Sequence, residues 1–141
     1  MRYVDVPDWR VFVDEDTYKE LNSPLTGKWM YFYVGREGHD FAEERCAEAV
    51  EKGIVSEAKV SDNPIRGASC YYLKIDDLEG HKRVIQYFLD NDMIQRTKAG
   101  RLHNISFKLN TQTRAGEYGN DYHSELKLEE LMDLDTGEWL V

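Results

Sequence analysis

The sequence is poor in cysteine, in proline and in long apolar runs, and each scarcity excludes a class of protein. Two cysteines and three prolines in 141 residues fit neither a disulfide-stapled scaffold nor a proline-rich disordered chain. No apolar run approaches the roughly 18 residues that a membrane-spanning helix needs, and the N-terminus carries no apolar signal segment. We therefore expect a reduced cytoplasmic protein with no membrane partner.

Positive charge is scarce as well. The chain has 18 Lys and Arg against 27 Asp and Glu, a formal charge of −9, which disfavours binding to duplex nucleic acid. What the chain does contain is 41% hydrophobic and 12% aromatic residues, enough to build a core. Its length is that of a single domain, so we expect one domain over residues 1–141.

Hydrophobic periodicity predicts an alternation of strands and helices in the middle of the chain. The order is strand, helix, strand, strand, helix, strand, over residues 28–34, 41–52, 54–61, 69–75, 78–90 and 101–109. This βαββαβ order is typical of a ferredoxin-like α+β fold, in which two helices cover one face of a four-stranded antiparallel sheet. We expect that core over about 28–109, with β extensions in residues 1–27 and 110–141.

The net charge is unevenly distributed. Residues 93–116 contain five basic residues and no acidic one, whereas residues 115–141 contain eight acidic residues and one lysine. Two interpretations are open: ordinary surface charge balanced across a hairpin, or an anion site inside an acidic shell. In the second case arginine suits phosphate, because its planar guanidinium offers paired donors.

The loop over residues 110–121 is the first candidate site. It holds Arg114, which could grip phosphate, Tyr118, which could stack on a base, and Asp121, which could accept hydrogen bonds from ribose hydroxyls. Two glycines in this loop permit a close approach to a ligand. The alternative is a mobile connector. No Gly-Lys-Ser/Thr sequence follows, so the loop is not a Walker-type phosphate loop.

Asn91 and Met93 are the second candidate site, at the expected end of the second helix. They could line a purine pocket, because methionine packs well on flat rings; the alternative is a helix C-cap followed by a core methionine. The four histidines and two cysteines have no metal-ligand spacing, and no nucleophile–base set stands out. We therefore expect no metal, no cofactor and no catalysis.

The chain as a whole resembles the phage Thoeris anti-defence proteins, which sequester glycocyclic ADP-ribose signals. The resemblance rests on chain length, on the aromatic strand Lys28–Val34, on Asn91-Asp92-Met93, and on Arg114 with Asp121. It implies a homo-oligomeric sponge, a dimer or larger, in the bacterial host cytoplasm. Such a sponge binds a small anionic nucleotide without cleaving it.

The resemblance also implies a role for individual residues. Arg114 would hold the diphosphate, Asp121 would meet a ribose, and Asn91, Met93 and a ring such as Phe88 or Trp29 would flank the adenine. Two other functions stay open on the sequence. One is an acidic interaction protein or nucleic-acid mimic that inhibits a host defence nuclease, and the other is a small nucleotide-processing enzyme.

Overall fold

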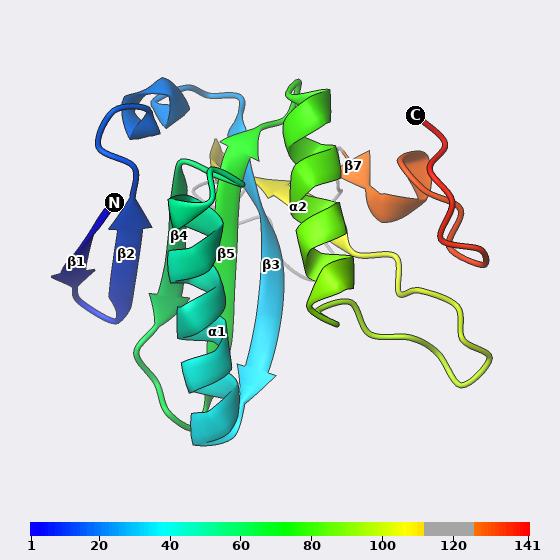
Figure 1. Cartoon of the computed structure of the whole chain (residues 1–141), viewed down its shortest axis with the longest axis horizontal. Coiled ribbons are helices and arrows are strands. Elements are labelled where there is room, and N and C mark those ends of the chain that lie inside the picture. Colours follow the sequence, from blue (N-terminus) through cyan, green and yellow to red (C-terminus); the bar gives the residue numbers. More distant parts are fainter. Residues whose placement is uncertain (112–125) are drawn as a thin grey trace.

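The computed structural model describes residues 1–111 and 126–141, and in this part of the chain two helices pack against an antiparallel sheet (Figure 1). The α+β class predicted from the sequence is therefore confirmed. The elements, in chain order, are β1 (Arg2–Val6), β2 (Trp9–Val13), the short 3-10 helix η1 (Tyr18–Leu21), β3 (Thr26–Val34), α1 (Gly35–Glu51), β4 (Glu57–Ser61), β5 (Arg66–Lys74), α2 (Leu78–Asp90), β6 (Ser106–Leu109), β7 (Leu126–Lys127) and the 3-10 helix η3 (Leu128–Glu130).

The sheet is larger than predicted. In the described residues it has seven strands, in the order β1-β2-β4-β5-β3-β6-β7, and every neighbouring pair is antiparallel. The prediction of four strands is thus wrong, because both extensions pair onto the sheet edges. The β1–β2 hairpin joins β4, from Trp9 opposite Ser61 to Val13 opposite Glu57, and β7 joins β6.

Alternation along β3 explains why its sequence is aromatic at almost every position. Trp29 and Tyr33 point to the side of the helices and are almost fully buried in the core, whereas Phe32, on the opposite side, is 70% exposed. Because successive side chains of a strand face opposite ways, one half of this run builds the core. The other half forms part of the open face of the sheet.

Local signals fix the limits of α2. The sequence predicts a cap at Asp76 or Asp77 and a helix end at Asn91-Asp92. In the structure Asp77 is the N-cap, and its carboxylate accepts a hydrogen bond from the Gly80 N–H at 2.9 Å. Asn91 is the C-cap, so both predictions are confirmed.

Helix α1 begins earlier than residue 41, at Gly35 directly after β3. Asp40 followed three residues later by Glu43 is a capping-box pattern, which predicts a cap at Asp40. That prediction is wrong, since Asp40 lies inside the helix.

The strand predicted over residues 101–109 is formed only from Ser106 onward. The chain before it follows other partners: Leu102 forms an isolated bridge with Arg96, and its N–H donates to the carbonyl of Leu134. As a result β6 is short, and within the described residues it pairs with β3 at two positions, opposite Gly27 and Lys28.

No helix in the described part of the chain is long and apolar enough to cross a membrane.

Candidate functional site

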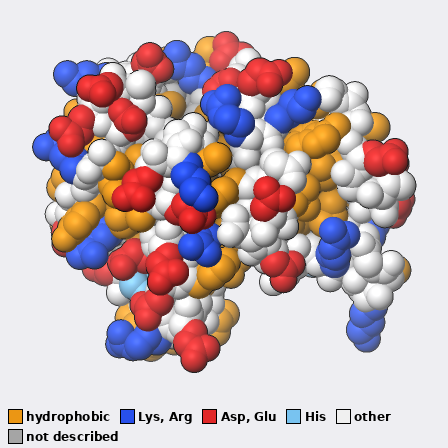
Figure 2. All heavy atoms as spheres, in the orientation of Figure 1, with side chains coloured by type: hydrophobic (Ala, Val, Ile, Leu, Met, Phe, Trp, Pro, Cys, Tyr) orange, Lys and Arg blue, Asp and Glu red, His pale blue; other side chains and the backbone are white. Residues whose placement is uncertain are grey.

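A cleft of about 510 Å³ opens where the chain leading into β6 separates from β3. In the same region the outline of the molecule is hollowed between the lower ends of β3 and α1 and the loop that follows α2 (Figure 2). Three segments of the sequence line the cleft, within residues 30–32, 93–95 and 103–108. The lining residues are Met30, Tyr31, Phe32, Met93, Gln95, His103, Asn104, Ile105, Ser106 and Lys108.

One side of the cleft is lined by apolar and aromatic side chains. Tyr31 reaches toward the helices, where its ring meets Phe41 edge-on at 5.8 Å between centroids. Partial burial raises the pKa of the Tyr31 hydroxyl, and the nearby Asp92 carboxylate adds to the rise, so this phenol stays protonated at neutral pH. Met93 is almost fully buried beside it. Aromatic and thioether side chains of this kind pack well against a planar ligand.

The other side of the cleft is polar and includes amide, imidazole and hydroxyl groups that are still available. Asn104 Oδ1 accepts a hydrogen bond from the Glu129 N–H at 2.9 Å, which orients the amide and leaves its amino group as a donor. Within the residues that the structure describes, the side chains of Gln95, His103 and Ser106 make no hydrogen bond. Lys108 adds an ammonium group to this lining. An apolar cleft with a few convergent polar groups is the usual form of a small-molecule site.

The structure places Met93 in this cleft, and Asn91 beside it in sequence has a different role. The Asn91 amide donates to the carbonyl of Tyr87 at 2.8 Å and so closes the last turn of α2. The sequence left two alternatives for this pair, a purine pocket or a helix C-cap followed by a core methionine. Asn91 is the C-cap. Met93 belongs to the core and also lines the cleft.

The two predicted adenine-flanking rings lie in the core. Trp29 and Phe88 are both 0% exposed. The Trp29 ring packs against His81 and Phe107, and the Phe88 ring meets Tyr71 edge-on at 5.1 Å. In this conformation neither ring has a face open to a ligand. The predicted site residues Arg114, Tyr118 and Asp121 lie outside the described residues.

Most of the cleft could not be found from the sequence. Gln95, Asn104 and Lys108 carry no motif, and they meet Met93 because the chain before β6 leaves the sheet. The available signal was the acid-free composition of residues 93–116, which includes all three.

The uneven charge is partly explained by pairing across the C-terminal region. Arg101 Nη1 lies 2.9 Å from Asp135 Oδ1, so one basic residue of the acid-free segment directly meets the acidic tail. Other acids of the tail stabilise turns: Asp133 Oδ1 accepts from the N–H groups of Asp135 and Thr136, which lowers its pKa, and Glu130 accepts from the Lys127 N–H. These acids are therefore already engaged within the chain.

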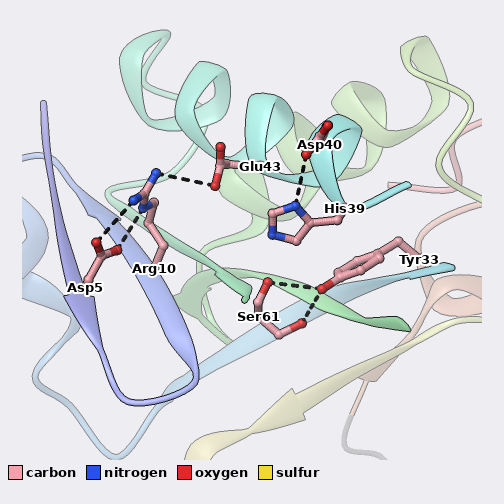
Figure 3. A network of polar contacts seen from close by, with 7 residues as sticks. All are labelled: Asp5, Arg10, Tyr33, His39, Asp40, Glu43 and Ser61. Carbon is pink, nitrogen blue, oxygen red and sulfur yellow. Dashed lines mark hydrogen bonds and ion pairs between the residues drawn. The ribbon is translucent and has the colours of Figure 1, made fainter. Parts of the chain in front are cut away.

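A second polar cluster lies between the β4–β5 turn and the start of α1 (Figure 3). The Tyr33 hydroxyl is 2.8 Å from Ser61 Oγ, and Ser61 Oγ also accepts the Ala68 N–H. His39 contacts Asp40 at 3.1 Å, and it meets Tyr33 through ring edges, at 5.5 Å between centroids. Because His39 makes no hydrogen bond to Ser61 in the described structure, this cluster does not form a nucleophile–base pair.

The same view shows how the N-terminal hairpin is tied to the first helix (Figure 3). Arg10 Nε donates to Asp5 Oδ1 at 2.8 Å across the β1–β2 pair, and the Arg10 guanidinium lies 3.5 Å from Glu43 on α1. The hydrogen bond from Arg10 lowers the pKa of the Asp5 carboxyl. Both partners are largely solvated, so this pair orients the hairpin and contributes little stability.

The thiols and the metal-binding residue types of the described part of the chain form no reactive or metal centre. Burial raises the pKa of the Cys46 thiol to about 12 and also raises that of Cys70, so both are protonated, buried core groups. Among residues 1–111 and 126–141, no group of three or more His, Cys, Asp or Glu side chains is arranged to hold a metal ion.

Two comparisons with known proteins found no match for this chain. No model of a known protein family matches it, and no curated protein sequence matches it. Function therefore has to be inferred from the cleft and its chemistry.

Proposed function

We propose that this protein binds a small anionic nucleotide of the ADP-ribose type in the cleft between β3 and the segment leading into β6. One observation carries the proposal: the cleft sets a flat apolar side next to amide, imidazole and hydroxyl groups that the described chain leaves available. That combination suits a ligand that is planar at one end and polar at the other. A hydrocarbon ligand would leave these polar groups unpaired.

Each part of the ligand has a fitting group in the cleft. The base would lie against Tyr31 and Met93, since these present flat or adaptable apolar surface. The Lys108 ammonium suits a phosphate as a point charge, and the amides of Gln95 and Asn104 suit ribose hydroxyls. Arg114 and Asp121 remain proposed ligands for the diphosphate and a ribose.

We further propose that the protein acts as a sponge: it holds the nucleotide immune signal uncleaved and thereby protects a phage from the host's defence. The support is the resemblance to Thoeris anti-defence proteins, together with a cleft that offers hydrogen-bonding groups and no nucleophile–base pair among its described residues. Such a sponge would work in the bacterial cytoplasm as a homo-oligomer. We also propose a ferredoxin-like core, which the neighbour order β4-β5-β3-β6 supports.

The test is to mix the purified protein with ADP-ribose and with its cyclic isomers, and to follow the melting temperature. A ligand present at 100 times its Kd stabilises the folded state by about 2.7 kcal/mol, so a clear rise is expected for at least one isomer. The complex is then heated and the released ligand is identified by mass spectrometry. Intact ligand supports the sponge, and a cleaved product would refute it.

The competing function is an acidic protein that mimics nucleic acid, favoured by the formal charge of −9. Arg114→Ala separates the two: a sponge should lose its nucleotide, whereas a mimic should keep its partner. The matched change in the tail is Glu129→Gln with Glu138→Gln. Both residues are exposed, and within the described structure neither carboxylate accepts a hydrogen bond or forms an ion pair. This double change should leave nucleotide binding intact.

A further inference from the structure

Strand β3 has an uncovered backbone edge, and this edge forms one wall of the cleft. On one side β3 pairs with β5 along its whole length, from Thr26 to Val34. On the other side, within the described residues, β6 covers it only at Gly27 and Lys28. Among the described residues, the stretch from Trp29 to Val34 therefore continues as an edge without a strand partner, and it contains neither a charged residue nor a proline to protect it.

The direction of the backbone groups follows from the register. In a strand the N–H and C=O of one residue point to the same side, and successive residues alternate. The Gly35 N–H donates to the carbonyl of Ile65, next to β5, so the odd-numbered residues of β3 turn toward β5. The even-numbered residues turn away from it, and Met30 and Phe32 are the ones that line the cleft.

We propose that this backbone edge selects the base of the bound nucleotide, an inference that rests on the proposed function. The C=O of Met30 accepts a hydrogen bond from an exocyclic amino group, and the N–H of Phe32 donates to the neighbouring ring nitrogen. Adenine offers this donor–acceptor pair at N6 and N1, so the ligand class is an adenine nucleotide with both positions free.

The side chains of the strand fit a ring placed in this way. A base that continues the plane of the sheet would have Tyr31 on its helix side and Met30 and Phe32 on the other, since alternate residues face opposite ways. Segment 103–106 closes the far side of the cleft. The space therefore suits a flat ring rather than a whole second sheet docked on the edge.

The experiment compares three ligands by calorimetry on the full chain: ADP-ribose, its N6,N6-dimethyl analogue and its 1-deaza analogue. The first analogue lacks the amino N–H and the second lacks the ring acceptor, so in each complex one backbone group of the strand edge loses its partner. Each should bind at least tenfold more weakly than ADP-ribose. Equal affinities would overturn the proposed backbone contact while leaving the proposed function standing. Failure of all three to bind would overturn the backbone contact, and failure of the cyclic isomers as well would overturn the proposed function.

A pair of variants tests the same contact from the protein side. Phe32→Pro removes the outward N–H, whereas Phe32→Ala keeps it, so only the proline variant should lose the preference for ADP-ribose over the 1-deaza analogue. If the proline variant does not fold, the amide NMR signal of Phe32 in the unchanged protein tests whether the Phe32 N–H contacts the ligand. A large shift with ADP-ribose that is absent with the 1-deaza analogue supports the contact, and identical shifts refute it.

Discussion

Trp29 Nε1–H donates a hydrogen bond to His81 Nδ1 at 3.0 Å, deep between β3 and α2. His81 Nε2 lies 2.8 Å from the carbonyl of Ile75, and a carbonyl can only accept, so the imidazole carries its proton on Nε2. Trp29 and His81 are 0% and 1% exposed. The neutral ring is thus satisfied at both nitrogens, and the pair joins the central strand to the helix.

Trp29→Phe should destabilise the fold, because it leaves His81 Nδ1 buried without a donor. The expected loss in the free energy of unfolding is about 1–3 kcal/mol from the unpaired acceptor, with the smaller ring adding to it. Urea denaturation followed by circular dichroism measures it. Trp139→Phe, at a partly exposed position, is the matched control and should cost far less; equal losses in the two variants would contradict this account.

Stability should fall on mild acidification. Burial lowers the pKa of His81 below its usual 6.5, while the Ile75 carbonyl and the Asp77 and Asp76 carboxylates oppose the shift. A lowered folded-state pKa means that the unfolded chain binds the proton more readily. The contribution is therefore fully present above about pH 6.5 and is lost as the pH falls through the folded-state pKa.

Thermal unfolding between pH 7.5 and pH 5 tests this dependence. The unchanged protein and the control His103→Gln, at an exposed position, should show the same decline in melting temperature. A variant without an ionisable group at position 81, such as His81→Gln, should be less stable at neutral pH and show a smaller decline. An unchanged decline in that variant would assign the effect to other groups.

Gly67→Ala should disrupt the junction between β5 and the β4–β5 turn. A methyl group there would lie 1.9 Å from Ser61 Oγ and 2.6 Å from the Tyr33 hydroxyl, so both must move. We expect a loss of about 1–3 kcal/mol in stability, as for other overpacked sites. Gly38→Ala, where the nearest atom is 3.2 Å away on a helix, should cost much less. A tolerated Gly67→Ala would mean that the Tyr33–Ser61 contact is dispensable.

Lys108→Gln should weaken nucleotide binding, since the side chain lines the cleft. Loss of a charge-assisted hydrogen bond of about 1.5–3 kcal/mol corresponds to roughly a tenfold or larger rise in the Kd for ADP-ribose. Lys98→Gln removes the same charge at an exposed position outside the cleft lining, and should bind as the unchanged protein does. Similar weakening in both variants would point to net charge rather than to the cleft.

Both thiols should be unreactive in the folded protein. Cys46 and Cys70 are 0% and 1% exposed, and burial raises the pKa of each, so little of the reactive thiolate exists at neutral pH. A colorimetric thiol reagent at pH 8 should label neither thiol over minutes, and it should label both at once in denaturant. Rapid labelling of the native protein would show that the core around α1 opens easily.

Elements with local signals could be predicted from the sequence. The cap and the end of α2 are encoded within a few residues: the sequence predicts a cap at Asp76 or Asp77 and an end at Asn91-Asp92, and the structure has them at Asp77 and Asn91. The start of α1 was missed because Gly35 looks like a chain breaker. It has φ +79°, which turns the chain directly from β3 into the helix, and that turn replaces the expected side-chain cap.

Long-range pairing could not be predicted. The residues of β1 and β2 predict extended structure, but they do not indicate that β2 pairs with β4. Residues 101–105 alternate like a strand, yet Leu102 pairs with Arg96 and with the carbonyl of Leu134 instead. The cleft exists because of that diversion, so only Met93 among the described site candidates was found in it.

The half-covered edge of β3 also bears on how the protein behaves when empty. An uncharged, aromatic strand edge pairs readily with any extended chain, including the same stretch of another copy that is still folding. A bound nucleotide would occupy that edge and so block its pairing with another chain, which would reduce aggregation. Yield of soluble protein in cells that make the signal, compared with cells that do not, would then report on occupancy before any purification.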